Sequence, residues 1–211
     1  MALRFPVKAV PRQVLAVRAN PEAANQPEAL PWVLYDTQAW TTAVTFNSQH
    51  FLTQPTDPTL GNMEGPGQLP DPQFFEIWYW GVDFLLAAVA AAAPAATVSP
   101  WADIIQFLWA QRGTFEFNIS NKRTGPFPLS FMHGSGGPQG FGYGNSATTA
   151  RFEYGNNGPA DGGFCVAGAI VIPPKLGFNV TLRTFAAVTL VNGSPLNVRA
   201  WMAGVLHRRV L

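Results

Sequence analysis

Charged side chains are scarce in this chain of 211 residues. They make up 12% of it, about half of the ~25% that is usual in soluble proteins. A free monomer normally keeps charges on its surface to prevent association, whereas charge-poor, aromatic-rich surface is typical of the centre of an interface. We therefore expect part of the outside to be covered by neighbouring subunits. The alternative is a neutral, glycine-rich secreted or thermostable domain.

Positive charge is missing from one long stretch. Between Ala19 and Gln111 there is no lysine or arginine, while nine acids lie there. The first 21 residues hold four bases and no acid, and from Arg112 onward there are nine bases against three acids. Such a partition predicts that surfaces of opposite sign meet, either within one molecule or between neighbours.

Cysteine and histidine are too few for a disulfide framework or an obvious metal site. Cys165 is the only cysteine, which excludes a disulfide within the chain and a cysteine-based metal site. His50, His133 and His207 lie far apart, and none has the His-x-x-x-His spacing of metal ligands. We expect no metal ion and no cofactor.

No catalytic motif is complete. A nucleophile elbow needs glycine two residues before Ser135, where His133 stands instead. The glycine-rich loop 134–145 lacks the Gly-Lys-Ser/Thr ending of a phosphate-binding loop. Glu76 and Asp83 lie in an apolar stretch. They could be the paired acids of a glycoside hydrolase, or they could both lie on the solvent-exposed face of a strand. We expect no enzymatic activity and no small-molecule substrate.

One stretch has the length of a membrane span. Phe84–Ala102 contains 19 residues without a charge, close to the ~20 that a spanning helix needs. It is mostly alanine, Pro94 interrupts it, and acids rather than bases flank it. We therefore do not expect a transmembrane helix, while contact with a bilayer surface stays open.

Most of the remaining chain predicts β-structure. Alternating polarity and an abundance of aromatic and β-branched residues predict eight or nine strands. The predicted strands cover 31–46 (as one or two strands), 74–84, 114–120, 129–133, 147–154, 164–172, 178–191 and 196–205. Asn192-Gly193 predicts a hairpin between the last two. The long loops at 47–72 and 134–145 are expected to serve function or contacts.

A helix and an arm complete the predicted organisation. Ser99 suits a helix N-cap and Pro100 the first helical position, and apolar residues follow at helical spacing. These signals predict one short inserted helix over about 99–111. Prolines punctuate residues 1–30, which we expect to form an extended N-terminal arm. Residues 31–211 are predicted to form a single antiparallel β-sandwich of the jelly-roll type.

In architecture and composition, the chain resembles the jelly-roll capsid proteins of icosahedral viruses, tailless bacteriophages among them. The features that carry the resemblance are the low charge, the basic arm Met1–Pro21, the strand-rich body Thr114–Val205, and the connections Asn47–Pro72 and Gly134–Asn145. It implies a structural virion protein whose subunits self-assemble, exchange arms and bury aromatic and proline-rich surface. Its partners would be copies of itself and other virion proteins, and its location the virion.

Seven residues are the candidates for such contacts. They are Arg4, Arg12, Arg18, Trp78, Trp80, Phe141 and Tyr143. The basic arm could also touch membrane head groups or nucleic-acid phosphates. The two tryptophans are expected either as interface anchors or as the core and rim of one sandwich. A carbohydrate- or receptor-binding β-sandwich is the alternative function, because lectin domains share the architecture and use exposed aromatic residues.

Overall fold

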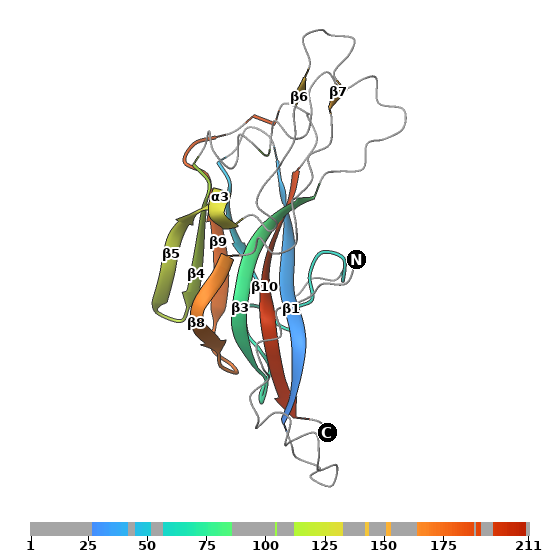
Figure 1. Ribbon diagram of the computed structural model, residues 1–211, viewed down its shortest axis with the longest axis vertical. Helices are drawn as coiled ribbons and strands as arrows, with labels where there is room; N and C mark the ends of the chain where they lie inside the picture. The colour runs from blue at the N-terminus through green and yellow to red at the C-terminus, as the bar shows by residue number, and fades with distance from the viewer. Residues whose placement is uncertain are drawn as a thin grey trace.

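The structure is a computed structural model, and it is mainly β (Figure 1). It describes residues 27–41, 45–51, 57–85, 104, 112–132, 142–143, 151–152, 164–187, 189–190 and 196–209. Two four-stranded antiparallel sheets face each other in a sandwich-like arrangement. This confirms the predicted antiparallel, mainly β architecture.

The first sheet has the strand order β1-β10-β3-β8. Its members are β1 (Pro27–Trp40), β10 (Leu196–Arg209), β3 (Phe74–Leu85) and β8 (Phe164–Ile172). The pairing of β1 with β10 runs without a break from Pro27 opposite Arg209 to Trp40 opposite Leu196. Both prolines of β1 therefore lie on an edge strand, where a missing backbone N–H is tolerated.

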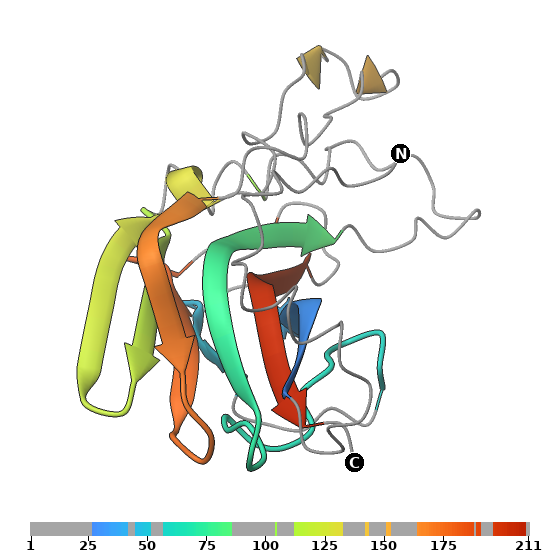
Figure 2. The ribbon, with the colours of Figure 1, turned by 60° about the horizontal axis from the view of Figure 1, so that its bottom comes forward.

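The second sheet has the order β2-β9-β4-β5. Its members are β2 (Asn47–His50), β9 (Phe178–Arg183), β4 (Thr114–Ile119) and β5 (Lys122–Pro128). A four-residue helix, α3 (Leu129–Met132), follows β5. Strands β6 (Gly142–Tyr143) and β7 (Arg151–Phe152) pair only with each other. Figure 2 shows the second layer beside the long, curved strands β3, β10 and β1.

The strand pairs are nested along the chain. Apart from the small β6–β7 sheet, the first strand pairs with the last, the second with the second-last, and so inward. These pairs are β1 with β10, β2 with β9, β3 with β8, and β4 with β5. The pairings of β10 with β3 and of β9 with β4 then join them into two sheets. Apart from β4 and β5, which form a hairpin, consecutive strands of these two sheets, such as β1 and β2, therefore lie in opposite sheets.

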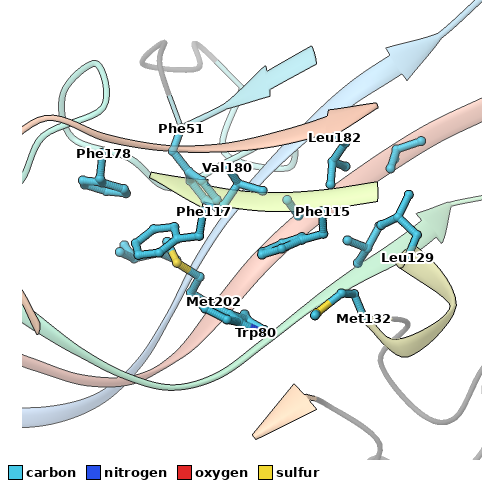
Figure 3. Close-up of a cluster of buried hydrophobic side chains, with 14 of the residues drawn as sticks. Phe51, Trp80, Phe115, Phe117, Leu129, Met132, Phe178, Val180, Leu182 and Met202 are labelled. Atoms are coloured by element: carbon cyan, nitrogen blue, oxygen red, sulfur yellow. The ribbon is translucent and has the colours of Figure 1, made fainter. Parts of the chain in front are cut away.

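The core fills the space between the sheets (Figure 3). Alternate residues of facing strands point inward, such as Phe115 and Phe117 from β4 and Met202 from β10. The Trp80 ring of β3 lies 5.4 Å from the ring centroids of both phenylalanines. Burying large side chains of this kind contributes about 1.5–3 kcal/mol each, which makes this cluster a main source of stability.

A β-bulge at Trp78 keeps the inward alternation of β3 in step with the sandwich. Against β10, Tyr79 pairs with Ala203 but Ile77 pairs with Gly204, so Trp78 is an extra residue. Both Ile77 and Trp80 thereby become buried although they are an odd number of residues apart. Gly204 lies where the strands approach closely, since a Cβ there would come within 1.8 Å of the Glu76 backbone oxygen.

Three local predictions are corrected by the structure. Residues 129–132 form helix α3, and the strand lies just before them as β5, whose polar and proline-containing sequence hid it. The loop predicted at 47–72 contains β2, a short polar edge strand. The prediction of a hairpin at Asn192-Gly193 is wrong. Strand β9 ends at Arg183 and belongs to one sheet, whereas β10 belongs to the other.

Other predictions fall partly outside the described residues. Of the helix predicted over about 99–111, the structure describes only Ile104, which is helical and buried. Of the predicted arm, residues 1–26 lie outside the description, and β1 already begins at Pro27. Of the loop 134–145, only the two residues of β6 are described.

Candidate functional site

The predicted interface residues are only partly visible. Arg4, Arg12, Arg18 and Phe141 lie outside the described residues, and Tyr143 lies in β6 with an undescribed side chain. Their roles remain predictions.

The two tryptophans of β3 have different environments. Trp80 is 1% exposed and packs against aromatic rings of the second sheet, so it belongs to the core, as the alternative prediction had it. It has no surface to offer to a partner. Trp78 is half-buried and lies on the face of the first sheet that is turned away from the core.

Trp78 belongs to a small cluster on that outer face. The Trp78 indole N–H donates to Glu76 Oε1 at 2.9 Å. The other carboxylate oxygen of Glu76 lies 3.7 Å from His207 Nε2. The His207 ring stacks on Phe74, with centroids 4.2 Å apart and planes 7° from parallel. Glu76, predicted as a candidate acid, is thus held by neighbours at the surface, while Asp83, seven residues along β3, is half-buried.

The outer faces of both sheets carry cross-strand contacts. On the first sheet, the cross-strand row formed by Tyr35, Trp201 and Gly81 is apolar or aromatic. A Cβ on Gly81 would lie 2.4 Å from the Trp201 ring, so this glycine makes room for the indole. On the second sheet, the Asn118 amide donates to Asn179 Oδ1 at 3.2 Å, one link of a polar network.

Within the described residues, ion pairs join the acidic middle of the chain to its basic C-terminal half. Arg208 pairs with Glu28 at 3.1 Å, and Lys175 pairs with Asp71 at 2.8 Å. Arg199 lies over the Tyr35 ring, 4.8 Å from its centroid. The charge partition is thus satisfied in part within one molecule, one of the two alternatives predicted from the sequence.

One buried polar site lies where β1 meets β2. Asp36 Oδ2 accepts a hydrogen bond from the Phe51 backbone N–H at 2.8 Å, and Phe51 has a left-handed φ of 66°. His50 is fully buried, with Nδ1 3.3 Å from the backbone oxygen of Asp36. Burial raises the pKa of Asp36 and lowers the pKa of His50 to about 4. These polar groups hold the β2 edge strand against β1.

The described residues contain no group of three or more His, Cys, Asp or Glu side chains that could hold a metal ion. His133 and Ser135 lie outside the description. Among the described residues no helix is long and apolar enough to cross a bilayer. Of the uncharged stretch weighed as a span, Phe84 belongs to β3.

Sequence reasoning missed the exposed apolar side chains. Phe185 is 76% exposed, and Trp32, Val33, Leu60 and Val171 are exposed as well. Phe185 lies within the strand that the sequence predicts over 178–191, whereas β9 ends two residues before it. The polar residues Arg183 and Thr184 before it were the available signal for an earlier end.

Comparison with protein-family models, curated proteins and solved structures finds no match to this chain. Function is therefore inferred from the chain's own residues.

Proposed function

We propose that this chain folds as a jelly roll and serves as a structural subunit of an icosahedral virus shell. The observation that carries the proposal is the strand order. Eight strands pair from the outside inward, and successive strands alternate between two sheets as far as β4. A jelly roll is an eight-stranded double sheet of two Greek keys, and viral capsid domains are among its best-known users.

The surface of the described residues supports a role in assembly. Large apolar side chains remain exposed at separate places, including Val171 on β8 and Phe185 beyond β9. Charge is scarce over the whole chain. Interfaces are depleted in charged residues at their centres and enriched in aromatic ones. A subunit surrounded by neighbours would cover these side chains, whereas a free monomer leaves them in water.

In this role the subunits self-assemble and contact other virion proteins, and the part of the predicted arm that precedes β1 crosses to neighbours. The basic side chains of that arm would meet acidic protein surface, nucleic-acid phosphates or lipid head groups. The contribution of the chain is structural, without catalysis or a cofactor, and its location is the virion.

Size-exclusion chromatography with negative-stain microscopy of the full-length protein tests this proposal. Repetitive contacts between identical subunits are expected to give closed particles or large symmetric oligomers. A species that stays near 22.8 kDa at every concentration would contradict the proposal.

A carbohydrate-binding role is the second candidate. The cluster of Phe74, Glu76, Trp78 and His207 places aromatic rings beside a carboxylate on an outer sheet face, and lectins also use the jelly roll. This role predicts a monomer or small oligomer that a glycan resin retains. It also predicts that Glu76→Gln abolishes the retention without altering the fold.

A further inference from the structure

Several exposed charged side chains have no ion-pair partner among the described residues, and four of them gather in two places. Three exposed bases have no acidic partner among the described residues, namely Arg112, Arg183 and Lys122. Two exposed acids, Asp57 and Glu64, have no basic partner among the described residues. Unpaired charges at the surface are available to a second molecule.

Two of the bases flank Phe185, the most exposed large apolar side chain in the described part of the chain. Arg112 lies just before β4, and its guanidinium carbon is 5.3 Å from the centroid of the Phe185 ring. Arg183 ends β9 and pairs with Thr114 at the start of β4. We call Arg112, Arg183 and Phe185 the basic-aromatic patch. Arginine and aromatic side chains are enriched at energetically dominant positions of interfaces.

The patch lies at the α3 end of the second sheet. Gly113, next to Arg112, accepts a backbone hydrogen bond from Leu129, the first residue of α3, at 2.8 Å. Figure 1 shows α3 at this end of β4 and β5.

The two acids lie in a loop with the opposite character. Asp57 and Glu64 enclose Leu60, which is 43% exposed. We call residues 57–64 the acidic loop. Thr59 donates to Asp57 Oδ1 from its hydroxyl at 2.7 Å and from its backbone N–H at 2.8 Å. These bonds favour the charged carboxylate and so lower the pKa of Asp57.

The acidic loop is held firmly on the free edge of β1. The Tyr35 hydroxyl donates to the Pro58 oxygen at 2.6 Å, and Arg199 Nη2 donates to the Thr59 oxygen at 2.8 Å. The Asn62 side chain accepts from the Tyr35 backbone N–H at 3.0 Å. A loop fixed in this way loses little entropy on binding, which favours its use as a contact.

We infer that the basic-aromatic patch of one subunit binds the acidic loop of a second copy of this chain. Each surface offers the charge that the other lacks, and each carries an exposed apolar side chain to bury. They lie on different parts of the molecule, so the contact is head-to-tail. Such contacts close into rings when the rotation permits. This inference rests on the proposed function, because it names one contact by which the shell subunits assemble.

Charge reversal with rescue tests the contact in the full-length protein. Arg112→Glu with Arg183→Glu reverses the patch, and Asp57→Lys with Glu64→Lys reverses the loop, since Glu64→Lys alone would leave it neutral. Among the described residues, the Glu64 side chain accepts a 3.4 Å hydrogen bond from Gln73. Lys122→Glu is the matched control, because Lys122 is also an exposed base but lies at the far end of β4 and β5. Light scattering gives the concentration at which assembly begins, and circular dichroism checks the fold.

The expected result is an assembly threshold at least about 10-fold higher for either reversal alone, since like charges that meet at an interface repel. Combining both reversals should bring the threshold back to within about 3-fold of the wild type, and Lys122→Glu should leave it unchanged. Phe185→Ala, at an exposed position with little effect on the fold, should also raise it.

Other outcomes overturn the contact. Assembly of the wild type that neither reversal changes would overturn the inference and leave the proposed function standing, as would a combined variant that is not rescued. If the patch variant instead loses only its retention on heparin, the patch binds polyanions and the contact between copies is wrong. A wild type that never assembles would overturn the inference and the proposed function together.

Discussion

Acid is expected to weaken the fold through His50. The imidazole is fully buried between β1 and β2, its Nε2 has no hydrogen-bond partner among the described residues, and the Phe46 ring lies 6.4 Å away. Burial without a counter-charge disfavours the protonated form, which lowers the pKa of His50 from 6.5 to about 4. In the unfolded chain the same ring takes up a proton near pH 6.5.

The sign and size of the effect follow from this difference. A base with a lowered folded-state pKa leaves stability intact above its unfolded pKa, and stability falls as the pH drops toward the folded value. With about 1.36 kcal/mol per pKa unit, the free energy of unfolding should fall by about 2.5 kcal/mol between pH 7 and about pH 4.5. Asp36, whose pKa is raised by burial, acts in the opposite direction in the acidic part of this range.

Urea unfolding of dissociated subunits at a series of pH values measures the effect. His50→Leu is the control, because it removes the titrating ring and keeps an apolar side chain in the same space while Asp36 still titrates. The difference between wild type and variant should change by about 2.5 kcal/mol over that interval. If the two proteins show parallel pH profiles, His50 is not the buried neutral base described above.

Three further predictions concern the core, a close strand approach and the charges. Trp80→Ala should lower the free energy of unfolding by about 3–5 kcal/mol, whereas Trp78→Ala on the outer face should cost clearly less; equal losses in urea unfolding would contradict the core assignment. Gly204→Ala should cost more than about 2 kcal/mol because its Cβ would meet the Glu76 backbone. Gly177→Ala, with no atom within 4 Å of the added Cβ, should change the free energy of unfolding by less than about 0.5 kcal/mol in the same urea experiment. Raising salt from low to ~0.5 M should weaken self-association if charges pair between subunits, and unchanged sedimentation across that range would refute such pairing.

The strands that sequence predicts best are those with one buried face. The segments around Phe75, Phe115 and Val198 alternate inward apolar residues with polar or small ones, and each lies in a strand of the expected place. Periodicity signals such strands because burial of one face repeats every second residue.

Edge strands gave no such signal. Strand β2 (Asn47–His50) is polar because its outer edge and one of its faces meet solvent. Strand β5 lies at the other edge of the same sheet and carries Lys122 and Arg123 for the same reason. The Asn-Gly dipeptide favoured a hairpin locally, but the nested pairing placed β9 and β10 in opposite sheets. Pairing between distant segments depends on tertiary contacts that local sequence does not encode.

The candidate contacts were hard to predict for a related reason. Trp80 and Trp78 have similar sequence surroundings, and only the bulge determines that one faces the core and the other the outside. Leu60 and Phe185 gain their exposure from the ends of neighbouring elements rather than from a motif. The division of charge was visible in the sequence, while the particular pairs, such as Arg208 with Glu28, required the fold.

Cryo-electron microscopy of the native source material tests the central claim most directly. We expect closed particles of icosahedral symmetry whose density accommodates this chain as repeated copies of the two-sheet body, with basic-aromatic patches meeting acidic loops. Finding the chain outside any shell, as a monomer or a small oligomer, would contradict the proposed function.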